Sequence, residues 1–226
     1  MKTTKLHDKD LIPNVIIHVI ILLSYLTIHS SNATINQTLS DQSIKQNIHK
    51  TKKPIVLFET SMGNFAMKLY PKKAPKTCEN FLRYVNDNYY NNTLFHRVID
   101  GFMIQGGGFK QGFTQKQTYI PIKNESKKGL PNLRGWVAMA LTTNPNSATS
   151  QFFINVANNP HLNYSIKNRT GYTVFAKIID GMSVIDQIKK VPTQRITIWS
   201  KLYKRYIPLY NVPKRDIIIY TAKQIQ

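Results

Sequence analysis

Short β-type runs, rather than long helical stripes, dominate this 226-residue chain from Ile55 onward. The runs at 55–60 and 64–69 flank Ser61-Met62-Gly63, which predicts a β-hairpin. Further strands are expected at 95–99, 102–105, 136–140, 152–156, 173–179 and 216–221. Because these runs do not alternate regularly with crossover helices, they argue against a doubly wound α/β fold. They favour an antiparallel sheet closed into a barrel, which leaves no open edge.

Two helices are expected to cover the ends of this barrel. Pro75 suits the first turn of a helix, and apolar residues follow at helical spacing from Cys78 to Val85. A second, shorter helix is expected at about 181–190, where apolar residues again share one face. The expected fold is therefore mainly β: a closed eight-stranded antiparallel barrel capped by two α-helices.

Composition excludes several classes of protein. With 42% apolar residues the chain can form a core, so wholesale disorder is excluded. Its only cysteine is Cys78, so neither an intrachain disulfide nor a thiolate metal cluster can form. Of six histidines only His96 and His161 lie beyond residue 50, and no metal or other cofactor is expected. The sequence has no nucleophile elbow and no carboxylates paired closely in sequence, which disfavours a hydrolase.

The N-terminal part is expected to lie outside the barrel. Residues 15–26 are mostly apolar, but they are shorter than the roughly 20 residues of a spanning helix. They have the length of a signal-peptide apolar region, and Ser31-Asn32-Ala33 offers small residues for cleavage. We therefore expect a signal peptide at 1–33, a flexible tether at 34–53 and the folded domain at 54–226. The protein would be periplasmic or secreted, with an uncleaved membrane anchor or a buried core helix as the alternatives.

Two segments combine polar and aromatic residues on strand-like runs. Residues 95–107, Phe-His-Arg-Val-Ile-Asp-Gly-Phe-Met-Ile-Gln-Gly-Gly, bring Arg97 and Gln105 onto two runs joined by a turn. Residues 150–155, Ser-Gln-Phe-Phe-Ile-Asn, add an amide and two aromatic rings. Pattern alone favours core strands with polar surface residues. Gly106-Gly107-Gly108 lacks the spacing of a phosphate loop and is expected to be a tight turn after a strand.

Both segments, with their spacing, resemble the cyclophilin family of peptidyl-prolyl cis-trans isomerases. The resemblance runs from about 55 to 193 and resumes at about 211–213. It includes Ala-Pro-Lys-Thr-Cys-Glu-Asn-Phe at 74–81 and Trp-Val-Ala-Met-Ala at 136–140, and residues 121–135 are similar to the bacterial branch. The resemblance implies the barrel expected above. It also implies an enzyme that accelerates rotation about X-Pro bonds in exported polypeptides and so assists their folding.

The resemblance also implies the site. Arg97 would stabilise the twisted amide, and Gln105 would support the arginine and contact the substrate backbone. Four residues match the proline pocket: Phe102, Met103, Phe153 and Leu162. Further residues match the substrate groove: Ala140, Leu141, Thr142, Gln151, His161 and Tyr172. Because the rotation needs no base, His96 is expected to be a structural, hydrogen-bonded histidine rather than a general base, while the alternative for Arg97 is a surface ion pair.

Three positions depart from the common pattern of the family. Leu141 stands where eukaryotic members usually carry Asn, and Tyr172 replaces their His. His161 stands where many members carry a Trp that is linked to tight cyclosporin binding, so weak cyclosporin binding is expected. None of the three is expected to touch Arg97, so the isomerase activity should remain. The alternative function is a chaperone-like binding module that holds prolyl segments without turning them over.

One segment lies outside the resemblance. The chain has a net charge of +20, which suggests an acidic partner, and an insertion at about 194–210 is basic, aromatic and free of acidic residues. Such a mixture indicates contact with lipid headgroups or nucleic-acid bases. The expected contacts are Arg195, Trp199, Lys201, Lys204 and Arg205. The alternative is a solvated loop or strand extension whose aromatic rings pack back on the barrel. Nothing in the sequence requires an oligomer, so a monomer is expected.

Overall fold

The computed structural model describes residues 53–200 and 204–226. The expected signal peptide, most of the tether and Lys201 lie outside the described residues. Within the described ranges, no helix is long and apolar enough to cross a membrane.

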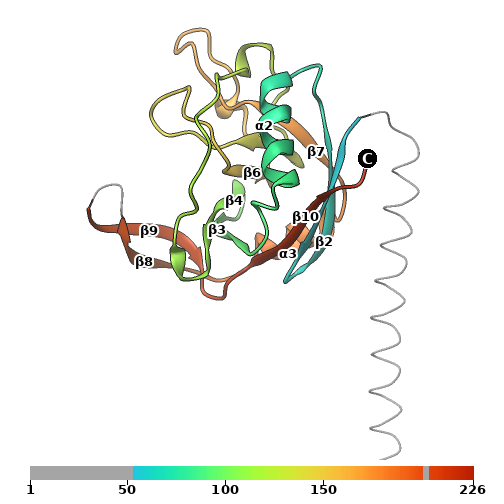
Figure 1. Ribbon diagram of the computed structural model, residues 1–226. Helices are drawn as coiled ribbons and strands as arrows, with labels where there is room; N and C mark the ends of the chain where they lie inside the picture. The colour runs from blue at the N-terminus through green and yellow to red at the C-terminus, as the bar shows by residue number, and fades with distance from the viewer. Residues whose placement is uncertain (1–52, 201–203) are drawn as a thin grey trace, which may run out of the picture. The chain divides into compact units, whose positions relative to one another are not determined.

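The described chain forms the expected closed antiparallel barrel (Figure 1). β1 (Ile55–Thr60) and β2 (Gly63–Leu69) form the expected hairpin, in which Thr60 pairs with Gly63. Around the barrel the order is β1-β10-β3-β4-β6-β5-β7-β2. The other barrel strands are β3 (Thr93–Ile99), β4 (Met103–Lys110), β5 (Trp136–Met139), β6 (Phe152–Asn155), β7 (Val174–Asp180) and β10 (Ile218–Gln224).

Both expected helices are present. α2 (Pro75–Asn86) begins at a proline, and the carboxylate of Glu125 caps it by accepting hydrogen bonds from the backbone N–H groups of Lys76 and Thr77. α3 (Met182–Ile188) follows Gly181, whose φ is +74°. A Cβ at Gly181 would come within 2.4 Å of the Asn64 carbonyl, so the turn requires glycine. Three short 3₁₀ turns complete the helical elements of the described residues: η1 (Gln111–Phe113), η2 (Ser126–Lys128) and η3 (Pro160–Leu162).

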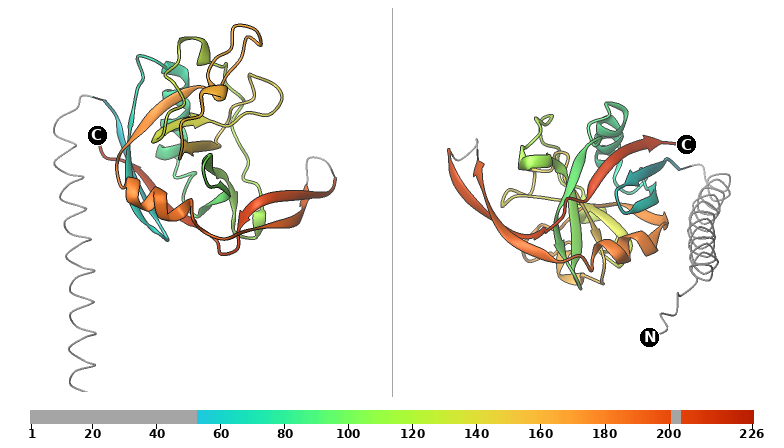
Figure 2. Two further views of the ribbon diagram at one scale, coloured as in Figure 1. Left: turned by 180° about the vertical axis from the view of Figure 1, so that it is seen from behind. Right: turned by 90° about the horizontal axis from the view of Figure 1, so that it is seen from below.

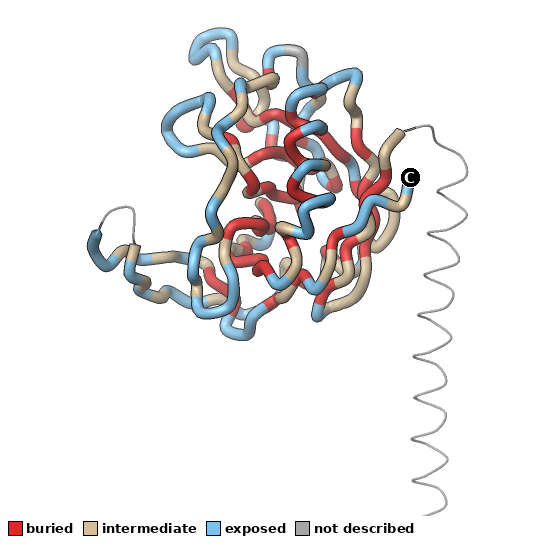
Figure 3. Tube along the Cα trace, viewed as in Figure 1, coloured by how far each residue is buried: buried red, intermediate tan, exposed pale blue. Residues whose placement is uncertain are grey.

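The barrel interior is filled with aromatic rings. Figure 3 shows that the buried residues are concentrated in the barrel. Phe58 stacks on Phe65 with 4.9 Å between ring centroids, and Phe152 meets Phe58 edge-on at 5.6 Å. Because side chains alternate along a strand, Phe153 points to the other face of the sheet. A second, smaller apolar cluster lies there, and its buried members are Met103, Ala138, Phe153, Leu162 and Val174.

The glycine run at 106–108 was expected to be a turn, and that prediction is wrong. All three glycines lie inside β4, which continues to Lys110. A Cβ at Gly108 would come within 2.6 Å of the Gln151 side chain. The run therefore lets a neighbouring side chain lie against the strand, which is an established use of glycine within a sheet.

The described parts of the 194–210 segment belong to a second, two-stranded sheet. β8 (Thr193–Ser200) pairs antiparallel with β9 (Arg205–Pro213), and the two strands extend beyond the barrel to one side (Figures 1 and 2). Trp199, Tyr206 and Tyr210 are 53%, 69% and 55% exposed. The strand extension of the alternative is therefore present, but these three rings do not pack back on the barrel, and Tyr203 lies outside the described residues.

Candidate active site

A hollow of about 90 Å³ lies on the outer face of β4, β6 and β5. The structure brings nine of the predicted site residues together around it. These are Arg97, Phe102, Met103, Gln105, Ala140, Leu141, Phe153, Leu162 and Tyr172. We call this hollow the prolyl pocket. Of the remaining predicted residues, Gln151 accepts a hydrogen bond from Gln105, whereas Thr142 and His161 line a neighbouring hollow of about 160 Å³.

A chain of amides holds Arg97 in the prolyl pocket. Arg97 on β3 pairs in register with Gln105 on β4, and its Nη1 donates to Gln105 Oε1 at 3.4 Å. Gln105 Nε2 in turn donates to Gln151 Oε1 at 2.9 Å. No carboxylate of the described residues forms an ion pair with Arg97, so the alternative of a surface ion pair is not supported.

The electrostatics of Arg97 follow from its half-buried position. Desolvation lowers the pKa of its guanidinium, and the nearby Tyr172 opposes that change. Because an arginine pKa ordinarily lies above about 12, the group stays charged at neutral pH. The site therefore holds a fixed cation whose charge is balanced by no acid among the described side chains.

The apolar wall of the pocket is built from buried side chains. Met103, Phe153 and Leu162 are all buried, and Phe102 is half-buried at the edge. The Tyr172 ring meets Phe153 edge-on at 5.5 Å. Beneath this wall lie further apolar residues that sequence reasoning did not assign to the site, namely Ala138, Val174, Leu130 and Trp136. For Trp136, Ala138 and Val174, alternation with interior residues along the strand was the signal that could have placed them on this face. Leu130 lies outside any strand, so no such signal exists for it.

The three departures from the family pattern lie at the rim. The His161 ring is exposed and stacks on Phe102, with 5.6 Å between ring centroids. Thr142 is exposed beside it in the neighbouring hollow. Leu141 and Tyr172 line both hollows, and neither hydrogen bonds to Arg97 in the described chain. The departures thus change the rim and leave the contact between Arg97 and Gln105 in place.

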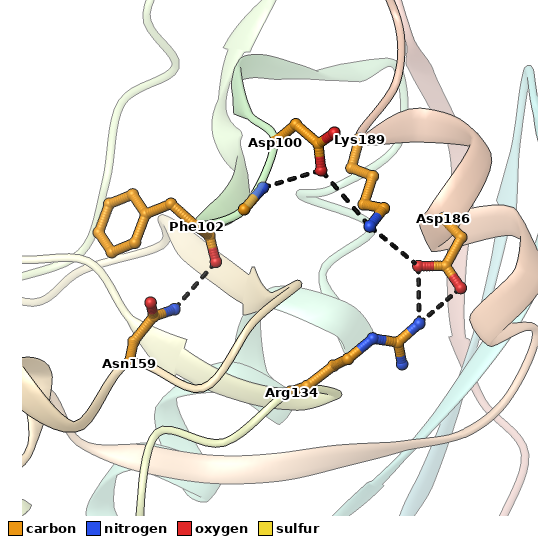
Figure 4. A network of polar contacts seen from close by, with 7 residues as sticks. Asp100, Phe102, Arg134, Asn159, Asp186 and Lys189 are labelled. Carbon is orange, nitrogen blue, oxygen red and sulfur yellow. Dashed lines mark hydrogen bonds and ion pairs between the residues drawn. The ribbon is translucent and has the colours of Figure 1, made fainter.

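Polar contacts behind the pocket hold the turn that carries Phe102 (Figure 4). The Phe102 carbonyl accepts a hydrogen bond from Asn159 Nδ2 at 2.9 Å. The same amide donates to Asn155 Oδ1 at 2.7 Å, inside a buried asparagine network. On the other side of the turn, Asp100 accepts from the backbone N–H of Gly101 and pairs with Lys189 of the segment after α3 at 3.4 Å. The sequence analysis did not identify these supports.

His96 lies next to Arg97 in sequence but is buried, and its ring packs on Phe109 at 4.7 Å. Burial lowers its pKa to about 4, although the Leu94 backbone opposes that shift. A neutral, buried imidazole fits the structural role expected for it. Its Nδ1 has no hydrogen-bond partner among the described atoms, so the expected hydrogen bonding is incomplete.

The described residues offer no other reactive centre. Burial raises the pKa of the Cys78 thiol to about 12, so the thiolate nucleophile is not formed at neutral pH. No group of three or more possible metal ligands occurs in the described chain. The chemistry that the prolyl pocket can perform is therefore binding and charge stabilisation around a single arginine.

Comparisons with known proteins agree with this geometry. The family model described as "Cyclophilin type peptidyl-prolyl cis-trans isomerase/CLD" matches residues 55–223. Peptidyl-prolyl cis-trans isomerase B of Escherichia coli is 51% identical over 167 residues, which are 73% of this chain and 96% of that protein. An Acinetobacter baylyi peptidyl-prolyl cis-trans isomerase is 48% identical over 169 residues, 75% of this chain and 89% of its own length.

The fold has a counterpart among solved structures. A Cryptosporidium parvum cyclophilin-type isomerase, crystallised in the presence of the dipeptide Ala-Pro, superposes with a TM-score of 0.61 at 30% identity. The match covers 76% of this chain and 99% of that one.

Proposed function

This chain belongs to the cyclophilin-type peptidyl-prolyl cis-trans isomerase family, and from that premise we propose that Arg97 is its catalytic residue. The protein is a peptidyl-prolyl cis-trans isomerase that acts on proline-containing polypeptides. The observation that carries the assignment of Arg97 is its position. It is a half-buried cation at the rim of an apolar hollow, held by Gln105 and unpaired with any described carboxylate.

The reaction needs no bond to break. Rotation about an X-Pro bond has a barrier of about 18–20 kcal/mol, because conjugation keeps the amide planar. In the twisted state the nitrogen becomes pyramidal and more basic. A fixed donor aimed at that nitrogen stabilises the transition state more than either ground state. Arg97 supplies such a donor, and the hydrogen bond from its Nη1 to Gln105 limits its motion.

The apolar wall holds one side of the rotating bond. The proline ring packs on Met103, Phe153 and Leu162, which bury it, while Phe102 closes the edge of the pocket. The backbone of the substrate lies along Ala140 and Leu141, beside the amide of Gln105. With the ring fixed, rotation is confined to the residue before proline.

A protease-coupled assay on an X-Pro tetrapeptide tests the assignment of Arg97. Arg97→Ala should lower kcat/KM about a hundredfold or more, the usual effect of removing one transition-state donor. The thermal midpoint should stay close to that of the wild type, since the side chain is half exposed. Uncatalysed rates for both proteins would show instead that the barrel only binds prolyl segments. Equal, catalysed rates would refute the role of Arg97.

We also propose that the isomerase acts on exported polypeptides, in the periplasm or outside the cell. The apolar run at 15–26 and the small residues before 34 support this proposal. Mass spectrometry of the N-terminus of the exported protein would distinguish cleavage after Ala33 from an uncleaved anchor. Recovery of the full chain from the cytoplasm alone would contradict both forms.

Cyclosporin sensitivity is expected to be weak. The exposed imidazole of His161 offers less apolar area than an indole at the same rim position. His161→Trp should therefore tighten inhibition of the tetrapeptide reaction by about tenfold, as expected for added burial of an aromatic ring. Nanomolar inhibition of the wild type would overturn this expectation.

A further inference from the structure

A second and larger cleft, of about 710 Å³, lies between the β8–β9 hairpin and the segment 109–117. We call it the hairpin cleft. β9 packs beside β3, so the hairpin leaves the barrel next to the strand that carries Arg97 (Figure 1). The cleft is distinct from the prolyl pocket, because the two share no lining residue.

The walls of the hairpin cleft carry apolar side chains among polar ones such as Gln115, Lys116 and Thr197. On the hairpin side, Ile198 of β8 and Ile207 of β9 form a cross-strand pair that lines the cleft and is only half-buried. On the opposite side stand Phe109 and Phe113, whose ring centroids are 6.3 Å apart. Partly exposed apolar side chains facing one hollow are typical of a surface that binds another molecule.

Phe113 stands in an unfavourable backbone conformation. Its φ is +57°, a region that bulky residues rarely adopt, and Gly112 before it has φ +71°. Such strain persists only where the surroundings hold it, and it is found preferentially at ligand-binding positions. Here it places an aromatic ring in the wall of the hairpin cleft, where glycine would fit the backbone better.

The strand β4 supplies residues to both the prolyl pocket and the hairpin cleft. Gln105 lines the pocket and Phe109 lines the cleft, four residues further along the strand. At about 3.3 Å per residue this separation is about 13 Å, which an extended substrate chain spans with about four residues. His96, the neighbour of Arg97, packs on Phe109 and connects the two regions on β3.

The charge around the cleft indicates which segment fits it. The sequence has no Asp or Glu between Gly101 and Asn124 or between Gln187 and Arg215, so both walls come from acid-free stretches. Lys110 and Arg195 lie exposed in these stretches. A partner that combines apolar side chains with carboxylates would complement both the lining and the charge.

We propose that the hairpin cleft is a second binding site for the unfolded polypeptide whose X-Pro bond occupies the prolyl pocket. It takes an extended segment with apolar and acidic residues about four residues from the proline. This inference rests on the isomerase activity at the prolyl pocket. Binding at two linked positions raises the effective concentration of the substrate, so the cleft acts mainly on KM for long substrates.

A polypeptide fits the observations better than a membrane or a nucleic acid. A planar lipid surface does not enter a concave cleft, and bases need free aromatic faces for stacking. The exposed rings of the hairpin already engage other side chains. Trp199 meets Tyr206 edge-on at 5.2 Å, and the guanidinium of Arg195 lies over Tyr210 at 5.3 Å.

The test compares three substrates on the full chain. One is an X-Pro tetrapeptide. The other two carry the same core with Phe, Leu and Glu added either before it or after it. Ile198→Asp should lower kcat/KM for one extended peptide about fivefold through KM, and leave the tetrapeptide unchanged. Ile166→Asp makes the same change at a side chain that is 87% exposed and outside both hollows, so it should alter neither rate. Phe113→Gly should reproduce the loss without lowering the thermal midpoint, because glycine adopts its φ freely.

The outcomes separate the possibilities. Equal rates of wild type and Ile198→Asp on both extended peptides would overturn the proposal. An equal loss of kcat/KM on the tetrapeptide would also overturn it. So would a loss of binding to anionic vesicles or single-stranded DNA in Ile198→Asp if peptide binding did not change. A wild-type chain inactive on the tetrapeptide would refute the isomerase mechanism instead. In that case, direct binding of the extended peptides to wild type and Ile198→Asp still decides the role of the cleft.

Discussion

The two faces of the strands β4, β5 and β6 differ in what their side chains do. Phe152 lies in the closed barrel interior, where it meets Phe58 and Phe81. Phe153, the next residue, lies on the outer face in the half-open prolyl pocket. The strand β3 repeats this division: Val98 belongs to the interior cluster, whereas Arg97 faces the pocket.

The difference shows how a short strand serves stability and catalysis together. Side chains alternate with a period of two, so each strand supplies one set of residues to the core and another to the pocket. The interior set excludes water on all sides. In the proposed mechanism, the outer set keeps one side open for the substrate, and a bound proline ring completes its contacts.

The largest expected effect comes from exchanging the two phenylalanines for alanine. Phe152→Ala should lower the free energy of unfolding by about 3–5 kcal/mol, because it leaves a cavity in the closed core. Phe153→Ala should cost less stability but lower kcat/KM about tenfold, since it removes a contact with the proline ring. Urea unfolding and the tetrapeptide assay measure the two effects. Equal losses of stability with unchanged kcat/KM would remove the distinction between the faces.

The next effect is a pH dependence from His96. Its pKa is about 4 in the folded protein and 6.5 in the unfolded chain, so below pH 6.5 the unfolded state binds more protons. Protonation of this group does not lower the free energy of unfolding above pH 6.5. Between pH 6.5 and about 4 it lowers that free energy progressively, and below about pH 4 the loss no longer grows. The difference of about 2.5 between the two pKa values corresponds to a loss of about 3 kcal/mol in the free energy of unfolding.

Unfolding of wild type and His96→Gln from pH 7 to pH 4 measures this contribution, because other groups titrate alike in both proteins. The free energy of unfolding should fall more steeply in the wild type. Identical slopes would show that His96 is not buried in its neutral form.

A smaller effect is expected when the hydrogen bond between Arg97 and Gln105 is removed. Gln105→Leu removes the hydrogen bonds to Arg97 and Gln151 while keeping a similar volume. Loss of one charge-assisted contact should lower kcat/KM about tenfold, and the loss should be mainly in kcat because Arg97 acts in the twisted state. A change in KM alone would assign Gln105 to substrate binding rather than to positioning Arg97.

The smallest effect is expected for the ion pair behind Phe102. Asp100→Asn keeps an acceptor for the Gly101 N–H but removes the charge that pairs with Lys189. Exposed pairs contribute about 0–1 kcal/mol, so kcat/KM should change less than about twofold. A tenfold loss, with stability unchanged, would show that the turn depends on this charge for the position of Phe102.

Much of the pocket could be predicted from the sequence, because its residues lie in short motifs with a recognisable order. Arg97, Gln105 and Phe153 occur on adjacent strands of the barrel, and the structure brings them together. Two supports were missed, the amide of Asn159 and the Lys189 ammonium. Both reach the turn at Phe102 from distant segments, and no local pattern indicates such contacts.

By itself, the sequence determined the approximate positions of the eight barrel strands and the two helices, the closed antiparallel architecture and the family. Hydrophobic periodicity and turn residues act locally, and the motifs survive in linear order. Only the tertiary structure decided that the glycine run continues β4 and that 193–200 pair with 205–213 in a separate sheet. It alone brought the hairpin opposite 109–117, far away in sequence, to form the hairpin cleft. The physical reason is that pairing between distant segments depends on which surfaces remain uncovered once the barrel has closed. The local sequence pattern does not indicate which surfaces these are.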